Sequence, residues 1–206
     1  MTIALFVGSP RARSNTRSIA AFLRSRLEER GQRVVVLDPK GARLDADGFL
    51  PESIDVARNA DTLVILAPVY LDLPPHVALA WLHALWERRE ALEGASPTVY
   101  AISHSGYFEP VHKRVSLEAL EHFTRRMGWA WRGGLAFGGT SPIDGKPLEE
   151  AGPFSKRVRP ALGALAGLIA EDLPVPADLV GAAGRPPVPL PKRLVVWVMN
   201  ATLRRQ

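Results

Sequence analysis

The sequence predicts an α/β protein with a doubly wound parallel sheet, and three observations support this. Short aliphatic runs alternate with segments of helical periodicity over the first 170 residues, as in repeated strand–helix units. The first three runs are continuously apolar, which is typical of strands covered on both faces. The first run ends at Gly8, where a loop rich in serine and arginine leads into a helix. Sheets of this kind bind ligands at the carboxyl ends of their strands.

Each element follows from its local pattern. The five expected strands cover residues 3–7, 33–37, 62–67, 98–103 and 131–137. Helical periodicity predicts helices over 15–30, 75–89, 111–127 and 154–170, and a short helix after Pro51. Pro160 marks either a kink or the true start of the last of these helices. We expect one domain over residues 1–172, then a proline-rich wrap over 173–191 and a basic terminal helix over 191–205.

Composition excludes several classes of function. The chain contains no cysteine, so thiol catalysis, disulfides and thiolate-bound metals are ruled out. Its net charge is +5, and five cations without an acid lie between Arg185 and the C-terminus. The other 184 residues balance at 21 basic and 21 acidic side chains, so the excess charge belongs to the tail. No basic strand carries interleaved aromatic residues, and we expect no nucleic-acid partner.

The two chain ends give a prediction about location. The first apolar run is short, lacks a preceding basic region and ends in a glycine turn, unlike a signal peptide. No run reaches the ~20 apolar residues that cross a bilayer, and we expect a cytoplasmic protein. Residues 190–206 place the segment LVVWVM between basic pairs. This pattern fits a docked terminal helix or a helix that lies on an anionic membrane.

The loop after the first strand, GSPRARSNT at 8–16, has the composition of an anion site. Hydroxyl, amide and guanidinium groups meet the unpaired N–H groups of a helix start, where the helix dipole favours negative charge. A phosphate monoester fits such a loop. Simple capping of the helix explains the same residue types equally well. The candidate ligands are Ser9, Arg11, Ser14, Asn15 and Thr16.

Two further loops are expected at the same edge of the sheet. The turn after the third strand holds Pro68, Val69, Tyr70 and Leu71, which suit a planar ring or a cap on the core. The loop after the fourth strand holds Ser105, Gly106 and Tyr107, and its glycine permits a close approach of backbone to a flat ligand. His104 is a weak catalytic candidate, since no nucleophile elbow and no acidic partner accompany it.

These segments resemble the flavodoxin-like NAD(P)H-dependent FMN reductases, a group that includes quinone, chromate and azo reductases. The resemblance rests on GSPRARSNT at 8–16, on APVY at 67–70 with its proline pair, and on ISHSGYFEP at 102–110. The segment GGLAFGGTSPIDGKPL at 133–148 is similar to the fifth strand of that group and its following loop. The resemblance implies a five-stranded sheet of order 2-1-3-4-5, FMN as cofactor, NAD(P)H as co-substrate and a homodimer.

The resemblance also implies roles for residues of this chain. The FMN phosphate would be held by Ser9, Arg11, Ser14, Asn15 and Thr16. The ring and its ribityl chain would lie along Pro68, Val69, Tyr70 and Leu71. The other side of the ring would be bordered by Ser105, Gly106 and Tyr107. No residue is expected to be catalytic in the strict sense, and no metal is expected, because the flavin carries the chemistry.

The chain departs from the group in the second loop. Leu71-Asp72-Leu73 replaces a small glycine-containing turn, and the apolar run 77–81 replaces a lysine usual in the next helix. An aspartate near the ring would oppose the negative charge of reduced flavin.

Three hypotheses about function follow. The first is an FMN-dependent NAD(P)H oxidoreductase that passes hydride through flavin N5 to quinones or other small electrophiles in ping-pong turnover. The alternatives are a flavodoxin-type electron carrier and a flavin-free, flavodoxin-like binding protein. The predicted helix over 75–89 carries an apolar load that suits a dimer interface or burial on its own sheet: Leu79, Trp81, Leu82, Leu85 and Trp86.

Overall fold

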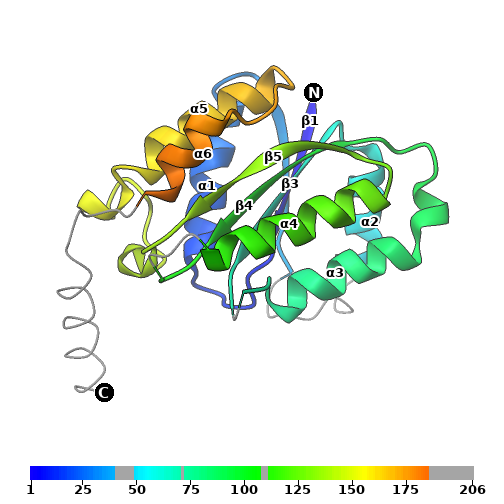
Figure 1. Cartoon of the computed structure of the whole chain (residues 1–206). Helices are drawn as coiled ribbons and strands as arrows, with labels where there is room; N and C mark the ends of the chain where they lie inside the picture. The colour runs from blue at the N-terminus through cyan, green and yellow to red at the C-terminus, as the bar shows by residue number, and fades with distance from the viewer. Residues whose placement is uncertain (40–48, 71, 108–110, 186–206) are drawn as a thin grey trace.

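The protein is a three-layer sandwich with one parallel sheet between two layers of helices (Figure 1). The computed structural model describes residues 1–39, 49–70, 72–107 and 111–185. The sheet has the order β2-β1-β3-β4-β5, which confirms the expected flavodoxin-like arrangement. Its strands are β1 (Thr2–Val7), β2 (Arg33–Leu37), β3 (Thr62–Pro68), β4 (Thr98–His104) and β5 (Ala130–Phe137).

The helices lie on both faces of this sheet. One face carries α1 (Asn15–Glu28), α5 (Val158–Ala170) and α6 (Ala177–Gly184). The other face carries α2 (Phe49–Asn59), α3 (His76–Glu87) and α4 (Val111–Arg126). The short 3-10 helices are η2 (Arg89–Leu92), η3 (Ser141–Ile143) and η4 (Gly152–Ser155).

Burial on both faces explains the continuous apolar runs. In β1, Leu5 packs with the core under α1 and α5, whereas its neighbour Phe6 packs with the core under α2 and α3. Phe6 stacks on Trp81 of α3 with ring centroids 3.9 Å apart and planes 6° apart. Alternate residues of a strand point to opposite faces, so a strand covered on both sides must be apolar throughout.

Two predicted segments differ in the structure. The helix expected from residue 154 begins at Val158, after the 3-10 turn η4, and Pro160 lies in its first turn, where a missing N–H costs no hydrogen bond. Residues 177–184 form α6 rather than part of an extended wrap. The N–H of Val175 donates to Arg132 O at 2.7 Å, which brings this segment to the edge of β5.

Other expectations fall partly or wholly outside the described residues. The predicted helix over 191–205 and the membrane contact through 190–206 lie outside them. Among the described helices, none has the length and apolar character needed to span a membrane. Within the same residues, no group of three or more His, Asp or Glu side chains is arranged to hold a metal ion.

The apolar side chains of α3 divide between the core and the surface. Trp81, Leu82 and Leu85 are buried against the sheet, as the burial alternative predicts. Trp86 is half-buried and lies under the guanidinium groups of two arginines, one on η2 and one on α4. Leu79 stays 41% exposed.

Candidate functional site

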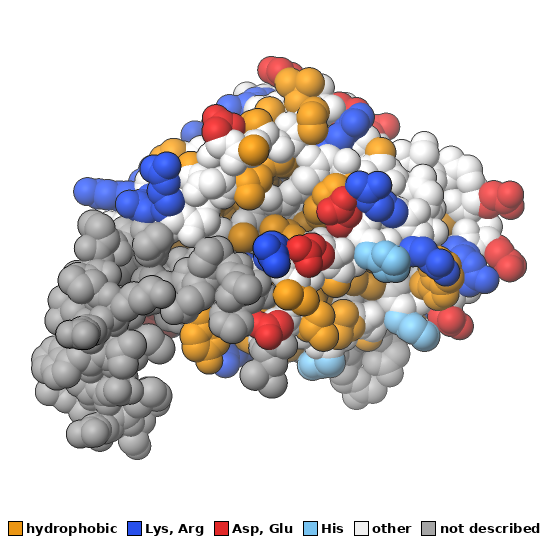
Figure 2. Space-filling view, viewed as in Figure 1, with side chains coloured by type: hydrophobic (Ala, Val, Ile, Leu, Met, Phe, Trp, Pro, Cys, Tyr) orange, Lys and Arg blue, Asp and Glu red, His pale blue; other side chains and the backbone are white. Residues whose placement is uncertain are grey.

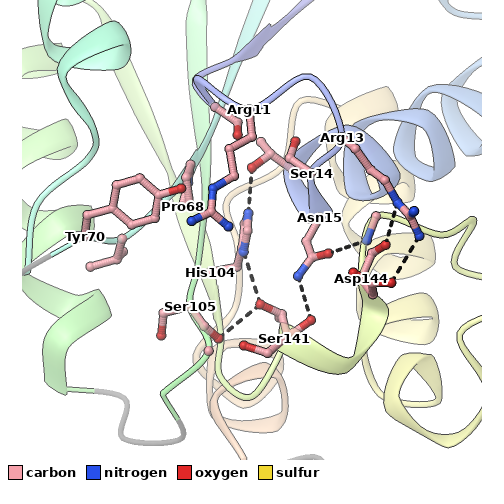
Figure 3. Close-up of a pocket in the computed structure, with 16 residues that line it drawn as sticks. Arg11, Arg13, Ser14, Asn15, Pro68, Tyr70, His104, Ser105, Ser141 and Asp144 are labelled. Carbon is pink, nitrogen blue, oxygen red and sulfur yellow. Dashed lines mark hydrogen bonds and ion pairs between the residues drawn. The ribbon is translucent and has the colours of Figure 1, made fainter. Parts of the chain in front are cut away.

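One pocket of about 330 Å³ lies where the carboxyl ends of β1, β3, β4 and β5 meet the first turn of α1 (Figure 3). This volume lies within the range of small-molecule sites, at its lower end. Ten of the twelve residues predicted from sequence line the pocket. Tyr107 is 57% exposed and does not line it, and Leu71 lies outside the described residues. The described residues that line the pocket are Ser9, Arg11, Arg13, Ser14, Asn15, Thr16, Pro68, Val69, Tyr70, His104, Ser105, Gly106, Thr140, Ser141, Asp144 and Gly145.

The loop after β1 packs directly on its neighbours through Gly8. The N–H of Gly8 donates to Leu66 O at 2.7 Å. A Cβ at this position would lie 2.9 Å from Ala78 Cβ and 3.0 Å from Leu66 O, closer than such atoms pack. Only glycine allows the loop to leave β1 this close to β3 and α3, which places the following residues over the pocket.

This loop presents several polar groups without a protein partner. The Ser9 hydroxyl is buried and bonds to no residue that the structure describes. The N–H groups of residues 11–13 likewise donate to no residue in the described part of the chain. The guanidinium of Arg11 extends into the pocket and forms no ion pair with any described carboxylate (Figure 3). A hydroxyl, free amides and a cation beside a helix N-terminus together form a site suited to an anion.

Ser14 caps the helix, as the simpler reading of this loop predicts. Its backbone is extended, and its Oγ accepts a hydrogen bond from the N–H of Arg17 at 3.3 Å. The Arg17 side chain donates twice to Asp38 at the end of β2, at 2.6 and 2.8 Å. The Ser14 hydroxyl proton remains available to a ligand, because accepting a bond does not use it.

Asn15 and Thr16 use their side chains inside the protein. Asn15 Nδ2 donates to Thr140 O at 2.7 Å, and its Oδ1 accepts from the N–H of Gly145 at 2.7 Å. Thr16 Oγ1 lies 2.8 Å from His104 Nε2. Both side chains therefore connect the start of α1 to other strand ends, although the sequence pattern pointed to phosphate.

His104 links three of the loops. Thr140 donates its hydroxyl proton to Ser105 O at 3.0 Å, so its oxygen accepts from His104 Nδ1–H at 3.2 Å. His104 Nε2 then accepts from Thr16, which fixes one tautomer of the neutral ring. Burial lowers the pKa of His104 to about 4, and the imidazole is neutral near pH 7. With both nitrogens bonded and no charge, it is poorly placed to transfer protons.

The second and third loops form the less polar side of the pocket. The N–H of Val69 donates to His104 O at 2.8 Å, which fixes the end of β3 against β4. Tyr70 and Leu73 exchange two backbone hydrogen bonds, which close a tight turn around Asp72 with its left-handed φ of 72°. Tyr70 remains 42% exposed at the pocket.

Sequence reasoning missed two parts of the site. The loop after β5 contributes Thr140, Ser141, Asp144 and Gly145 to the lining. The resemblance of residues 133–148 was a signal for this loop, but it assigned no individual residue. In α4, the buried Lys113 Nζ donates to Tyr107 O at 3.1 Å and Ser105 Oγ at 3.4 Å, which supports the third loop from behind. No sequence pattern predicted that role.

Comparison with protein families supports this geometry. Residues 1–94 match the model of the family described as NADPH-dependent FMN reductase. The match covers 94 of the 206 residues. The match spans β1 to η2, and it includes the first two loops of the pocket. No curated protein matches the sequence.

Several solved structures share the fold. An apo-form NADH:FMN oxidoreductase (EMOB) aligns with a TM-score of 0.61 and 20% identity, over 93% of this chain and 98% of that one. An oxidoreductase of Corynebacterium diphtheriae aligns with a TM-score of 0.57 and 22% identity, over 82% of this chain and 97% of that one. An NAD(P)H:quinone oxidoreductase of Methanothermobacter marburgensis aligns with a TM-score of 0.59 and 17% identity, over 80% of this chain and 96% of that one.

The matched family supports an oxidoreductase with FMN as cofactor and NAD(P)H as co-substrate. The residues present fit the phosphate of FMN. The Ser9 hydroxyl is buried without a partner among the described residues, and Arg11 supplies a positive charge in the same pocket. Asp144, the only carboxylate among the described lining residues, is paired with Arg13 at 3.1 Å. An anion would therefore meet donors and little repulsion.

Proposed function

We propose that the protein is an FMN-dependent NAD(P)H oxidoreductase that reduces quinones or other small electrophiles in ping-pong turnover. The observation that carries the proposal is the buried, unpartnered Ser9 hydroxyl facing the same pocket as Arg11 and the turn at Tyr70. Bound FMN would supply the redox chemistry, which is hydride transfer from NAD(P)H and delivery of the two electrons to the acceptor.

The first loop is assigned to the phosphate. Its oxygens would accept hydrogen bonds from Ser9 Oγ, from the hydroxyl of Ser14 and from the N–H groups of residues 11–13, and Arg11 would neutralise its charge. A phosphate monoester carries close to two negative charges and three acceptor oxygens at neutral pH. The positive end of the α1 dipole adds to this attraction.

The ring is assigned to the space between Pro68, Val69 and Tyr70 on one side and Ser105 and Gly106 on the other. These residues would hold and orient the ring and keep water from part of it, without a covalent bond to any side chain. His104 is neutral near pH 7 and hydrogen-bonded through both ring nitrogens, so it does not act as a base there. The residues assigned to the ring therefore act by orientation.

FMN binding is the first test. We expect the purified protein to take up FMN at tens of micromolar or below and to oxidise NAD(P)H when loaded. Arg11→Ala should weaken FMN binding about tenfold, as for a hydrogen bond to a charged group, while riboflavin binding should change little because riboflavin lacks the phosphate. Arg24→Ala is the matched control, since Arg24 is exposed and pairs with Glu28 along α1.

Three outcomes separate the hypotheses. Absence of FMN uptake would point to a flavin-free binding protein. Uptake without NAD(P)H oxidation would point to an electron carrier. For the loaded enzyme, initial rates at several acceptor concentrations should give parallel double-reciprocal lines, and intersecting lines would contradict ping-pong turnover.

We also propose that the protein is a homodimer whose second copy covers the pocket mouth. Figure 2 shows hydrophobic side chains gathered near the N-terminal ends of α3 and α4. Four of the exposed apolar residues come from these helices and the adjoining turns: Tyr70, Leu73, Leu79 and Val115. Contiguous exposed apolar surface is typical of interaction sites.

Light scattering coupled to size-exclusion chromatography tests the dimer. We expect twice the mass of one chain for the natural protein and the mass of one chain for Leu79→Glu, which places a charge in the proposed interface. Leu173→Glu is the matched control, because Leu173 is equally exposed but follows α5 on the other side of the sheet. A natural protein with the mass of one chain would overturn the proposal.

A further inference from the structure

We propose that Asn15 and His104 are positioning residues, which hold the loop after β5 (residues 138–146, the β5 loop below) in place before any cofactor binds. The proposal rests on the proposed function in one respect, since the wall it describes belongs to the assigned FMN pocket. It differs from the role that the sequence pattern implied for Asn15, which was contact with the phosphate.

The amide of Asn15 joins α1 to the β5 loop at two points. Its donor group bonds to Thr140 O at 2.7 Å, and its acceptor group bonds to the N–H of Gly145 at 2.7 Å. These two bonds use both ends of the side chain on backbone groups five residues apart. Nδ2 carries a second N–H, so any bond to a phosphate would come from that N–H, with the amide still held by its bonds to Thr140 and Gly145. The two observed bonds therefore give Asn15 a clamping role in the structure itself.

The β5 loop lies close against the first loop at this clamp. Gly145 has a left-handed φ of 63°, and a Cβ there would lie 2.6 Å from Arg13 Cγ and 3.3 Å from the N of Ser14. Arg13 also donates to Asp144 O at 3.0 Å and pairs with its carboxylate at 3.1 Å. That ion pair is about two-thirds exposed, so it contributes little energy on its own.

His104 holds the other end of the same loop. Thr140 donates to Ser105 O through both its N–H and its hydroxyl, each at 3.0 Å. The imidazole connects this point to Thr16 in the first turn of α1. The β5 loop is thereby bonded to the end of β4 and to the start of α1, the two elements between which it lies (Figure 3).

These bonds set the position of one wall of the pocket. Thr140, Ser141 and Gly145 line the cavity, and all come from the β5 loop. A loop that is already ordered in the folded protein loses little conformational entropy when the cofactor binds. The cost of ordering it therefore does not weaken cofactor binding. Asn15 and His104 thus strengthen flavin binding through the loop that they hold.

Hydrogen exchange in the cofactor-free protein tests this directly. In the natural protein, the amides of Thr140 and Gly145 should exchange slowly. Asn15→Leu, which matches the shape of asparagine without its hydrogen bonds, should raise exchange in residues 138–146 at least tenfold and leave β3 unchanged. Asn59→Leu is the matched control, because it removes a 2.7 Å bond to Asp55 O on the distant helix α2. Unchanged exchange in 138–146 of Asn15→Leu would overturn the proposal.

Flavin binding distinguishes a clamp from a phosphate ligand. If Asn15 positions the loop, Asn15→Leu should weaken the binding of FMN and the binding of riboflavin by the same factor. We expect about tenfold for two lost hydrogen bonds. Loss confined to FMN would assign Asn15 to the phosphate and overturn the proposal. A protein that binds neither flavin would refute the proposed function, while the exchange experiment would still decide the clamp.

Conservative variants separate positioning from a general loss of stability. His104→Gln offers one acceptor for Thr16 and one donor for Thr140, and it should retain slow exchange of the β5 loop and flavin affinity within about threefold. His104→Leu should lose both. If Asn15→Leu does not fold, Asn15→Asp keeps the acceptor for Gly145 and loses the donor to Thr140, so exchange should rise at Thr140. Equal behaviour of His104→Gln and His104→Leu would contradict the role of His104.

Discussion

Thr16 Oγ1 lies 2.8 Å from His104 Nε2, so a buried imidazole at the end of β4 is bonded to the first turn of α1. The two residues are 88 positions apart in the sequence. The same imidazole reaches Thr140 beyond β5, and all three polar side chains are nearly inaccessible to solvent. A buried polar network stabilises a structure only while each of its polar groups has a hydrogen-bond partner. The protonation state of His104 therefore matters to the stability of the fold.

We predict that the free energy of unfolding falls as the pH is lowered from about 6.5 to about 4. Unfolded histidine binds a proton near pH 6.5, whereas burial lowers the pKa of folded His104 to about 4. Between these values the unfolded state binds more protons, so acid favours unfolding; the contribution is complete above pH 6.5. The shift corresponds to about 3 kcal/mol. Urea unfolding at pH 7, 5.5 and 4.5 measures it, and His104→Gln should show a shallower decline than the natural protein. Parallel curves would refute the prediction.

The fold could be predicted from sequence because its signals are local. The strands β1 to β3 are runs of mostly aliphatic residues, and the turn at Gly8 stands shortly before Ser14, the N-cap of α1. The wrap predicted over 173–191 contains α6 because its alanine content suits a helix as well as a coil. The packing of this segment on β5 and α5 favours the helix over the coil. That packing cannot be predicted from the local sequence.

The pocket could be predicted in part for the same reason. Residues of the first two loops were found from motifs, whereas the β5 loop reaches the pocket through contacts such as Asn15 to Thr140, 125 residues away. Amide and hydroxyl groups suit a phosphate and a backbone carbonyl equally, so the residue type of Asn15 could not reveal its partner. Tyr107 lies outside the lining; its carbonyl accepts from Lys113 Nζ and from the N–H of Gly139, two contacts that the sequence pattern did not foretell.

Ser9→Ala should weaken FMN binding without weakening the fold. The Ser9 hydroxyl is buried and bonds to no described residue, so removing it leaves no partner behind and relieves a desolvated polar group. We expect FMN affinity to fall about fivefold to tenfold and the free energy of unfolding to stay level or rise by up to ~1 kcal/mol. Fluorescence titration and urea unfolding measure the two quantities. A drop in stability of the cofactor-free protein would mean that the hydroxyl serves the fold instead.

Gly106→Ala should weaken flavin binding, and a second change should restore it. A Cβ at Gly106 would overlap the hydroxyl of Ser141 on the β5 loop, whereas Ser141 Cβ lies 3.7 Å away, at ordinary contact distance. We expect Gly106→Ala to lower FMN affinity about tenfold as the two loops move apart, since overpacking of this kind typically costs 1–3 kcal/mol. Ser141→Ala added to Gly106→Ala should recover most of the loss. Failure of the double variant to recover would indicate that the added methyl group meets the ring itself.

Tyr100→Phe should lower stability and leave the pocket unaffected. The Tyr100 hydroxyl donates to Leu173 O at 2.8 Å, next to Asp172, whose left-handed φ of 53° turns the chain from α5 toward α6. Burial, reinforced by the negative charge of Asp172, raises the pKa of Tyr100 to about 12, so the hydroxyl keeps its proton and the bond persists at physiological pH. Loss of the bond should cost about 1 kcal/mol and lower Tm by about 2–4 °C in a chain of this size. Tyr70→Phe is the matched control for stability, because Tyr70 is 42% exposed and its hydroxyl bonds to no described residue. Equal Tm values for the two variants would show that Tyr100 contributes through its ring alone.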